Sequence, residues 1–550
     1  MWKRCNRALV PFILTAWLIV GCVGLPANSV LAPAAEDLAV YHKALAPGQR
    51  SLLDELPPFP EYKIQVEIDP EEQELHGQMT LELPADDSVP PLQDYYFRLY
   101  PNLDHFHGSM DIDLVAINSQ AAPYSFNTSD TAIHVAVPTD AIKPGKPITF
   151  SINWRANVQS VPSHIYSLFG QGEGVMSLPL FYPVLAVQDE DSPSGWNLGV
   201  GLPRGDAAFT EMALYQVKVV VPQNYVVVGT GSLIDLHDWQ GDDAVDDEGE
   251  ETPSEVLREW TLVSPPAREF ALFVSDQFRL VETFANDVRI NSWHLSGDEI
   301  TGRAAAEYTA AALRIYQEIF GPYPYAELDV VPGPMGVHGM EYPGLFELGV
   351  GLYRERAGDM ESRIAHEVAH QWWYNLVGND PVNVPWLDEG LAEFSTYFYR
   401  EKIRGEKSAE WLAENRWWAA YEYAIERGED AVVNQPAEAF GSNYETMIYG
   451  KAALYHYALL KVLGEQRYLE LLRRYLDENR YQVATPQDFQ SLAEEFAGSD
   501  AVEIYERWIE SAEDPTPTPT PTPTPQADAE DGQQPPETPE TPDDAATPSP

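Results

Sequence analysis

The chain has 550 residues, of which 44% are hydrophobic and 11% aromatic, so it is long enough for two to four domains with sizeable cores. Its 86 acidic residues outnumber 34 basic ones, and the net charge of -52 argues against a nucleic-acid partner, which requires a basic surface. Cys5 and Cys22 are the only cysteines, so the chain beyond them has no disulfides and no cysteine nucleophile.

Residues 1–23 have the pattern of an export signal. Basic residues at positions 3, 4 and 7 precede an apolar run that extends to Val23. Within it, the segment IVGC resembles a bacterial lipobox, in which the cysteine, here Cys22, is lipidated and tethers the protein to the membrane surface. The alternative is a plain secretory signal that is cut near Ala32 to Ala35. Both readings predict an exported, extracytoplasmic protein.

Residues 24–56 are predicted to form a linker, with a short helix near Asp37 to Leu45. Alternating apolar and polar residues then begin, in runs such as YKIQVEIDP, HGQMTLELP, ITFSINWRA and YQVKVVVP. Runs of this length, bounded by Pro, Gly, Asn and Asp, predict the antiparallel strands of a sandwich-like β domain over residues 57–296.

Two segments of this β domain raise the alternative of a metal site. Residues from Gly241 to Glu251 are an acidic block, but they lack the ligand spacing of an EF-hand, so we expect a disordered hairpin tip. His105 and His107 can share one face of a strand. We expect these two histidines to lie at an exposed strand end, and a metal site is the alternative.

The hydrophobic period becomes helical from Thr301. The run AAAEYTAAALRIYQEIF predicts a helix that Gly321 and Pro322 end, and a strand follows at Ala326 to Val331. Helices are predicted from there onward, which gives a second domain over residues 297–511. The Thr-Pro repeats and acidic residues of 512–550 cannot bury apolar surface, and we expect them to be disordered. The predicted fold class is multidomain β plus α+β.

The segment HEVAH, residues 366–370, supplies half of a metal site. If residues 361–377 are helical, His366 and His370 lie one turn apart on one face and both reach the same ion. A catalytic zinc takes three protein ligands and leaves a position for water. Glu389 follows His370 after 18 residues, in WLDEGLAEF, and is the predicted third ligand because this second apolar-periodic stretch makes a helix able to pack against the first.

Two further glutamates have predicted roles around this ion. Glu367 is rotated by about 100° from His366, which takes it off the ligand line and leaves it near the open position. It is therefore the predicted general base for metal-activated water that attacks a carbonyl. Glu393, one turn after Glu389, is predicted to accept a hydrogen bond from a ligand histidine. The pattern predicts a hydrolase with one zinc ion per chain, and the alternative is a solvated acidic patch with two surface histidines.

HEVAH, the glutamate of WLDEG and the upstream GMEYP together resemble the gluzincin aminopeptidases, which include aminopeptidase N and leukotriene hydrolase. The resemblance implies a thermolysin-like, mainly helical catalytic domain with the zinc ligands and base named above. It also implies that Glu341, within Gly339–Met340–Glu341, grips the free amino group of the substrate. Here His338 replaces the first glycine of the family element, and Tyr342 replaces its asparagine.

The same resemblance implies a tyrosine that stabilises the tetrahedral oxyanion. The family element Tyr-x-Lys-Gly corresponds to residues 449–452, with alanine in place of the last glycine. A phenol aimed at developing negative charge is a suitable donor. Tyr449 is the predicted residue, and Tyr444 is the competitor.

The predicted function is zinc-dependent removal of N-terminal residues from peptides outside the cytoplasm. A second amine-binding residue, which the family uses, is not recognisable in the segment from Ser177 to Asp191. A zinc endopeptidase or another hydrolase with the same centre is therefore an alternative. A surface binding protein with an idle metal site is another. Peptides are the expected partners, and no pattern in the sequence specifies an oligomer.

Overall fold

The computed structural model describes residues 38–85, 92–127, 129–162, 165–189, 192–201, 205, 208–239, 256–336 and 338–512. The export signal with Cys22, the acidic block from Gly241 to Glu251 and nearly all of the predicted tail lie outside these residues. None of the helices in the described part of the chain combines the length and the apolar character that a membrane span requires.

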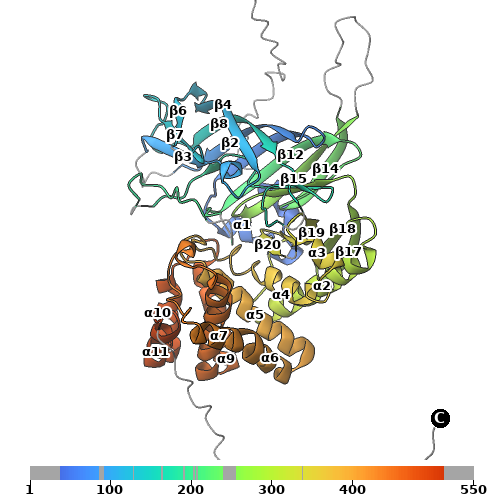
Figure 1. The fold of residues 1–550 in the computed structure, drawn as a ribbon. Coiled ribbons are helices and arrows are strands. Elements are labelled where there is room, and N and C mark those ends of the chain that lie inside the picture. Colours follow the sequence, from blue (N-terminus) through green and yellow to red (C-terminus); the bar gives the residue numbers. More distant parts are fainter. Residues whose placement is uncertain are drawn as a thin grey trace, which may run out of the picture.

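The first half of the chain folds into three β-sheets, which occupy the upper part of Figure 1. The largest sheet has eight strands in the order β14-β15-β12-β1-β2-β8-β4-β5. They are β1 (Glu61–Asp69), β2 (Glu74–Leu83), β4 (Gly108–Ile117), β5 (Gln120–Ala121), β8 (Ile148–Val158), β12 (Ala213–Pro222), β14 (Ser232–Trp239) and β15 (Leu257–Ala267). All pairs are antiparallel except β1 with β12, which is parallel.

Two four-stranded sheets complete this β region. One has the order β13-β16-β10-β9 and the other β11-β3-β7-β6. Their strands are β3 (Asp94–Arg98), β6 (Tyr124–Phe126), β7 (Ala132–Ala136), β9 (Gly170–Gly172), β10 (Val175–Pro179), β11 (Val184–Leu185), β13 (Val226–Gly229) and β16 (Ala271–Ser275). The buried faces of all three sheets share one hydrophobic core. The predicted N-terminal β-rich region is confirmed.

A fourth sheet lies between the β region and the helices. Its order is β17-β18-β19-β21-β20, from β17 (Arg279–Ala285), β18 (Val288–His294), β19 (Glu327–Gly333), β20 (Gly339–Tyr342) and β21 (Leu345–Gly349). β18, β19 and β21 are parallel to one another, and β17 and β20 are antiparallel edge strands. The GMEYP segment thus begins in an edge strand, β20.

This sheet contains strands from both sides of the domain boundary predicted at residue 296. β17 and β18 precede that residue, yet β18 pairs with β19 through residues 289–292. The alternating pattern of β17 and β18 looks like that of the preceding strands, so local sequence does not reveal that their partner follows the helix α2 (Glu299–Ile319). The sheet topology puts the junction before β17.

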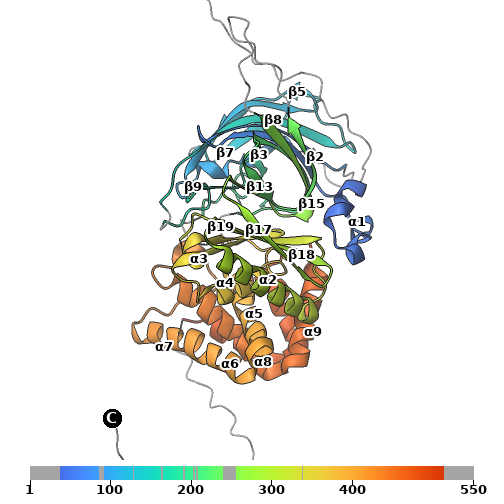
Figure 2. The ribbon, with the colours of Figure 1, turned by 90° about the vertical axis from the view of Figure 1, so that its right-hand side faces the viewer.

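In this fourth sheet, called the central sheet below, β19 and β21 are buried on both faces because their alternate residues enter different cores. Val330 and Phe346 join the core of the helical region, whereas Val331 and Leu345 join that of the β region. Continuous burial of β19 and β21 follows from this position. The two halves of the molecule are therefore packed through one sheet, as the second view also shows (Figure 2).

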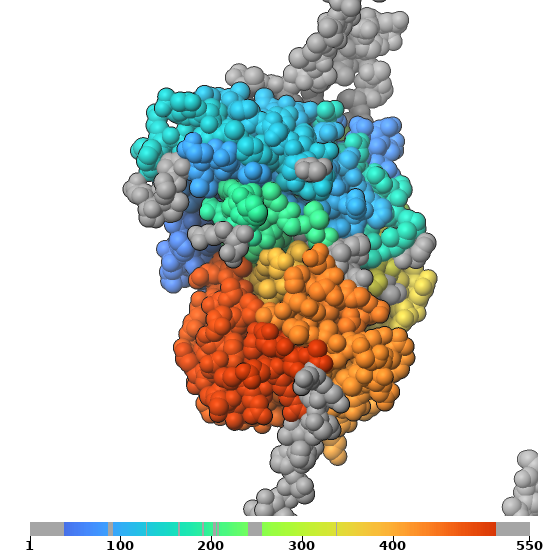
Figure 3. Space-filling model, turned by 60° about the vertical axis from the view of Figure 1, so that its left-hand side comes forward, coloured from blue at the N-terminus to red at the C-terminus, as the bar shows by residue number. Residues whose placement is uncertain are grey.

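Helices form the remainder, seen as the orange and red lower part of Figure 3. They are α3 (Val350–Arg354), α4 (Met360–Ala369), α5 (Trp386–Arg404), α6 (Glu406–Leu412), α7 (Ala419–Glu426), α8 (Ala452–Leu463), α9 (Glu465–Asn479), α10 (Pro486–Ala497) and α11 (Ser499–Trp508). Two π-helical segments, Ala413–Trp418 and Thr446–Lys451, lead into α7 and α8. The helix expected over 361–377 ends at Ala369, and the chain turns sharply a few residues later at Tyr374, which has a φ of 132°.

The predicted linker is docked over its described part. It contains the 3-10 turns Leu38–Ala44 and Pro47–Gln49 and the short helix α1 (Leu52–Glu55). The buried Tyr41 hydroxyl donates to Glu61 at 2.5 Å, and the backbone N–H of Ala46 donates to the carbonyl of Pro324 at 2.9 Å. Residues 38–56 therefore pack against both halves of the molecule instead of spanning solvent.

Arg268 ties the β region to the helical region. Its buried guanidinium donates to the carbonyl oxygens of Tyr374 and Gln482, each at 2.6 Å. The neighbouring Glu269 accepts a hydrogen bond from the Tyr374 hydroxyl at 2.6 Å. These contacts hold the turn that follows α4 against the β region.

We expect Glu347→Gln to make thermal stability less dependent on pH. Glu347 is fully buried on β21 beside Ser177, and burial raises its pKa from 4.5 to about 8. Between these values the unfolded chain loses the proton while the folded chain keeps it, so stability falls by about 1.4 kcal/mol per pH unit. The wild-type melting temperature should therefore drop more between pH 5 and pH 8 than that of the variant.

Glu503→Gln on the surface of α11 is the matched control, and its pH profile should follow the wild type. Parallel profiles for the wild type and Glu347→Gln would contradict an ionisable, buried Glu347.

Candidate metal centre

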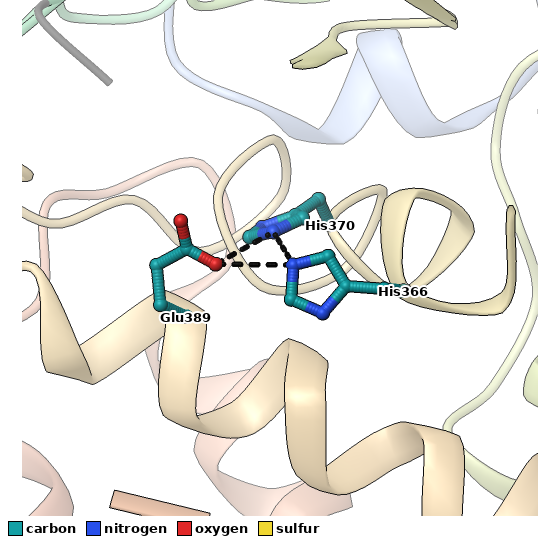
Figure 4. A group of neighbouring side chains, drawn as sticks. All are labelled: His366, His370 and Glu389. Carbon is teal, nitrogen blue, oxygen red and sulfur yellow. Dashed lines mark hydrogen bonds and ion pairs between the residues drawn. The ribbon is translucent and has the colours of Figure 1, made fainter. Parts of the chain in front are cut away.

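α4 and α5 bring two imidazoles and one carboxylate together. The Nε2 atoms of His366 and His370 are 3.1 Å apart. Glu389 Oε2 lies 3.1 Å from His366 Nε2 and 3.4 Å from His370 Nε2. Figure 4 shows all three groups pointing to the same place. The three predicted ligands are thus brought together.

These separations fit a metal ion. With metal–ligand bonds of about 2.0–2.1 Å, a tetrahedral zinc ion holds its ligand atoms about 3.3–3.4 Å apart. Two imidazole nitrogens and a carboxylate oxygen are also a donor set that zinc accepts. All three side chains are buried, with His370 fully inaccessible.

Each ligand is oriented by a second contact. His366 Nδ1 lies 3.3 Å from Glu393 Oε2, and His370 Nδ1 lies 2.9 Å from the carbonyl oxygen of Trp373. The Tyr449 hydroxyl donates to Glu389 Oε1 at 2.5 Å. Outer contacts of this kind fix the ring orientation and tautomer of metal-binding histidines.

Glu393 is in turn held by two residues that the sequence analysis did not single out. Trp417 Nε1 donates to Glu393 Oε1 at 2.6 Å, and Arg416 donates to Glu393 Oε2 at 3.1 Å. Both donors lie on the π-helical segment Ala413–Trp418. No spacing motif connects this segment to HEVAH, so its role emerges only from the fold.

The carboxylates and histidines of the centre stabilise each other's charged forms, as the shifts in their pKa values indicate. Burial opposes ionisation of Glu393 and Glu389. At Glu393, the effect of burial is outweighed by Arg416 and His366, which lower the pKa of the carboxyl group to about 2. At Glu389, hydrogen bonds from His366 and His370 outweigh burial and also lower the pKa. The pKa of His370 is raised, because Glu341 and Glu389 overcome the opposing effect of burial.

Glu367 lies off the ligand triangle and next to β20. A Cβ atom added to Gly339 would lie 2.2 Å from Glu367 Oε1, so a larger residue there would displace this carboxylate. Burial raises the pKa of Glu367 against the lowering effects of His366 and Arg363. The carboxylate is thus held beside the centre in a form that binds a proton more readily than a solvated glutamate does.

Glu341 also faces the centre. Its Oε1 lies 3.6 Å from His370 Nδ1 and accepts no hydrogen bond from the described residues. The residue is 4% exposed, and burial raises the pKa of its carboxyl group. A buried acceptor of this kind is suited to a cationic ligand group.

Gln371 holds the strand that carries Glu341, a function that was not predicted. Its side-chain amide donates to the carbonyl of Tyr342 at 3.0 Å and accepts from the N–H of Gly344 at 2.9 Å. Gln371 directly follows HEVAH, so its position in the sequence is the only signal that could have suggested this contact.

Tyr449 and Tyr444 differ in their contacts at the centre. The Tyr449 hydroxyl forms a hydrogen bond with the ligand Glu389, whereas the ring of Tyr444 packs near Tyr449, with 6.3 Å between the ring centroids. Both line a cavity of about 710 Å³ above the centre. This cavity is also lined by Gly339, Met340, Glu341, Glu367 and Tyr166, the last from the β region.

The other segments considered for ligands lie elsewhere. His107 contacts the hydroxyl of Ser167 at 2.8 Å, and His105 belongs to neither of the potential metal-binding groups of the described residues. None of the described residues from Ser177 to Asp189 lines the cavity. The second of these groups consists of Glu341, Glu367 and His370, so it shares a ligand with the first.

Comparisons with known proteins agree with this geometry. Residues 304–508 match the peptidase family M1 domain. The chain is 24% identical to an alanine/arginine aminopeptidase of Saccharomyces cerevisiae and 26% identical to aminopeptidase M1-D of Oryza sativa subsp. japonica. These alignments cover 43% and 42% of the chain, but only 29% and 28% of the relatives.

Solved structures show the same fold over a larger part of the chain. The chain resembles the crystal structure of an M1 zinc metallopeptidase from Deinococcus radiodurans, with a TM-score of 0.60 and 19% identity, over 85% of this chain and 96% of that one. A mutant of that protein bound to a Tyr-ser-ala substrate is equally similar, with a TM-score of 0.60, 18% identity and coverage of 84% and 96%.

The two-domain arrangement and the predicted family resemblance are thereby confirmed. Residues 304–508 of this chain thus correspond to a peptidase family M1 domain.

Proposed function

We propose that this protein is a zinc-dependent aminopeptidase, with one zinc ion per chain bound by His366, His370 and Glu389. The observation that carries the proposal is the buried Glu341, which presents a carboxylate oxygen without a hydrogen-bond partner among the described residues beside three converging ligands. A free amino group satisfies that oxygen, whereas an acylated nitrogen carries no charge to pair with it. The M1 relatives named as aminopeptidases support the same activity.

In the proposed reaction, each residue of the centre has a separate role. Zinc supplies Lewis acidity toward water and toward a carbonyl oxygen. Glu367 takes the proton from the attacking water and gives it to the departing amine. The Tyr449 hydroxyl, which donates to Glu389 in the free protein, turns to donate instead to the oxyanion of the tetrahedral state. Gly339 and Met340 border the cavity on the strand that carries Glu341, where an extended peptide backbone pairs with the edge of the sheet.

The direct test compares a short peptide with its N-acetylated form. The zinc-loaded protein should release the N-terminal residue from the free peptide and leave the acetylated one intact, as measured by mass spectrometry. Glu367→Gln should retain zinc by elemental analysis and lose about 10²–10⁴-fold in kcat. Equal cleavage of both peptides would point to an endopeptidase, and stoichiometric zinc without any turnover would point to a binding protein.

We expect Glu393→Gln to weaken zinc binding by about 10–100-fold. The amide is neutral, and it can accept from His366 Nδ1 only if it gives up the arrangement that Arg416 and Trp417 now hold. Competition with a zinc-binding dye measures the dissociation constant. Glu401→Gln, further along α5 and away from the histidines, is the matched control. Equal zinc affinity of both variants would argue against an orienting role for Glu393.

We also propose that the protein acts outside the cytoplasm and that a lipid on Cys22 holds it at the membrane. The basic and apolar pattern of residues 1–23 supports this. Expression with a labelled fatty acid should mark the wild type, whereas Cys22→Ser should be exported without the label. A labelled Cys22→Ser protein would contradict lipidation at this residue.

A further inference from the structure

Arg363 is a cation in the cavity without a local counter-charge. It lies on α4 one turn before Glu367, is partly buried and lines the cavity. In the part of the chain that the structure describes, no carboxylate lies within 4.0 Å of its guanidinium. Glu367, Glu393 and Glu389 act on it from longer range and, against the effect of burial, raise its pKa.

The second arginine of the cavity provides a contrast. Arg416 forms an ion pair with the buried Glu393, with 3.0 Å between Nε and Oε1, and thereby supports His366. The charge of Arg416 is therefore already paired within the protein. Arg363 has no comparable partner among the described residues, although its guanidinium is a planar fork that binds carboxylates through two parallel hydrogen bonds.

β20 and α4 set the position of Arg363 relative to a bound peptide. Gly339 lies against Glu367, and Glu341 lies beside His370. His338, just before them, lines the same cavity as Arg363, and the arginine charge, after burial, contributes to lowering the pKa of His338. The strand therefore passes the arginine first, then the general base, and then the acidic group proposed to hold the amine.

Distances along the helix agree with the size of a dipeptide. Arg363 and His370 are seven residues apart on α4 and its end, about 10 Å by helical rise. Each residue of an extended peptide spans about 3.3–3.6 Å. With the amino group at Glu341 and the first carbonyl at the metal, the second residue extends away from His370 and toward Arg363.

We propose that Arg363 binds a carboxylate on the leaving side of the scissile bond, so that the preferred substrates carry an acidic second residue or end there as dipeptides. This proposal rests on the proposed aminopeptidase function. In a chain with a net charge of -52, an arginine that forms no ion pair in a cavity lined by five glutamates gives such substrates a specific attraction that the surrounding surface does not.

The experiment compares substrates that share an N-terminal leucine. Leu-Asp-amide against Leu-Asn-amide isolates a side-chain carboxylate at nearly constant shape, and Leu-Ala against Leu-Ala-amide isolates the terminal carboxylate. For the wild type we expect kcat/KM to be about tenfold higher for the charged member of at least one pair, in keeping with a charge-assisted hydrogen bond. The pair that responds identifies the carboxylate.

Two variants test the assignment to this side chain. Arg363→Gln should bring the charged-to-neutral ratio of the responding pair close to one, and Arg363→Glu should make Leu-Lys-amide a better substrate than Leu-Asp-amide. Arg356→Gln removes an exposed guanidinium just before α4 and should keep the wild-type ratios. A loss of folded or metal-loaded protein lowers kcat/KM for both substrates of a pair equally. The ratio between them therefore reports only the preference for the charged substrate.

The outcomes distinguish this proposal from the function on which it rests. Wild-type ratios near one, or an unchanged ratio in Arg363→Gln, would overturn the role of Arg363 while peptide cleavage stands. If the zinc-loaded wild type cleaves none of the peptides, the aminopeptidase function fails, and the role of Arg363 fails with it.

Discussion

The convergence of His366, His370 and Glu389 is the constraint on which the rest of the structure depends. Three electron-pair donors within 3.4 Å of one another in a buried site are stable only if each is held in place. Glu393, the carbonyl of Trp373 and the Tyr449 hydroxyl provide these contacts. Loss of an outer contact therefore affects the centre without touching a ligand directly.

The central sheet fixes the position of the metal centre relative to the rest of the molecule. Its two faces belong to two different cores, so the β region and the helices cannot shift independently without exposing apolar surface on β19 and β21. Gln371 then links β20 to the end of α4. The edge strand and the metal ligands are thus held at a constant spacing, which an extended substrate between them requires.

The two π-helical segments have a related effect. One carries Arg416 and Trp417, and the other carries Tyr449. A π-helical turn contains an extra residue and changes the direction of the side chains that follow, and such turns are frequent at functional sites. Here the side chains of both segments reach α5 from outside it, at Glu393 and Glu389.

The sequence by itself determined the ligand set of the metal centre and the order of β and helical regions. Those features depend on local periodicity, since two histidines four residues apart on a helix must share a face. It did not determine where the two regions join, because β17 and β18 look like any other alternating strands and find their partner only after α2. Nor did it reveal that α4 ends at Ala369, that residues 38–56 are docked, or that Arg416, Trp417 and Gln371 support the centre. Those features are contacts between segments distant in sequence or backbone turns set by packing, and only the tertiary structure decides which segments meet.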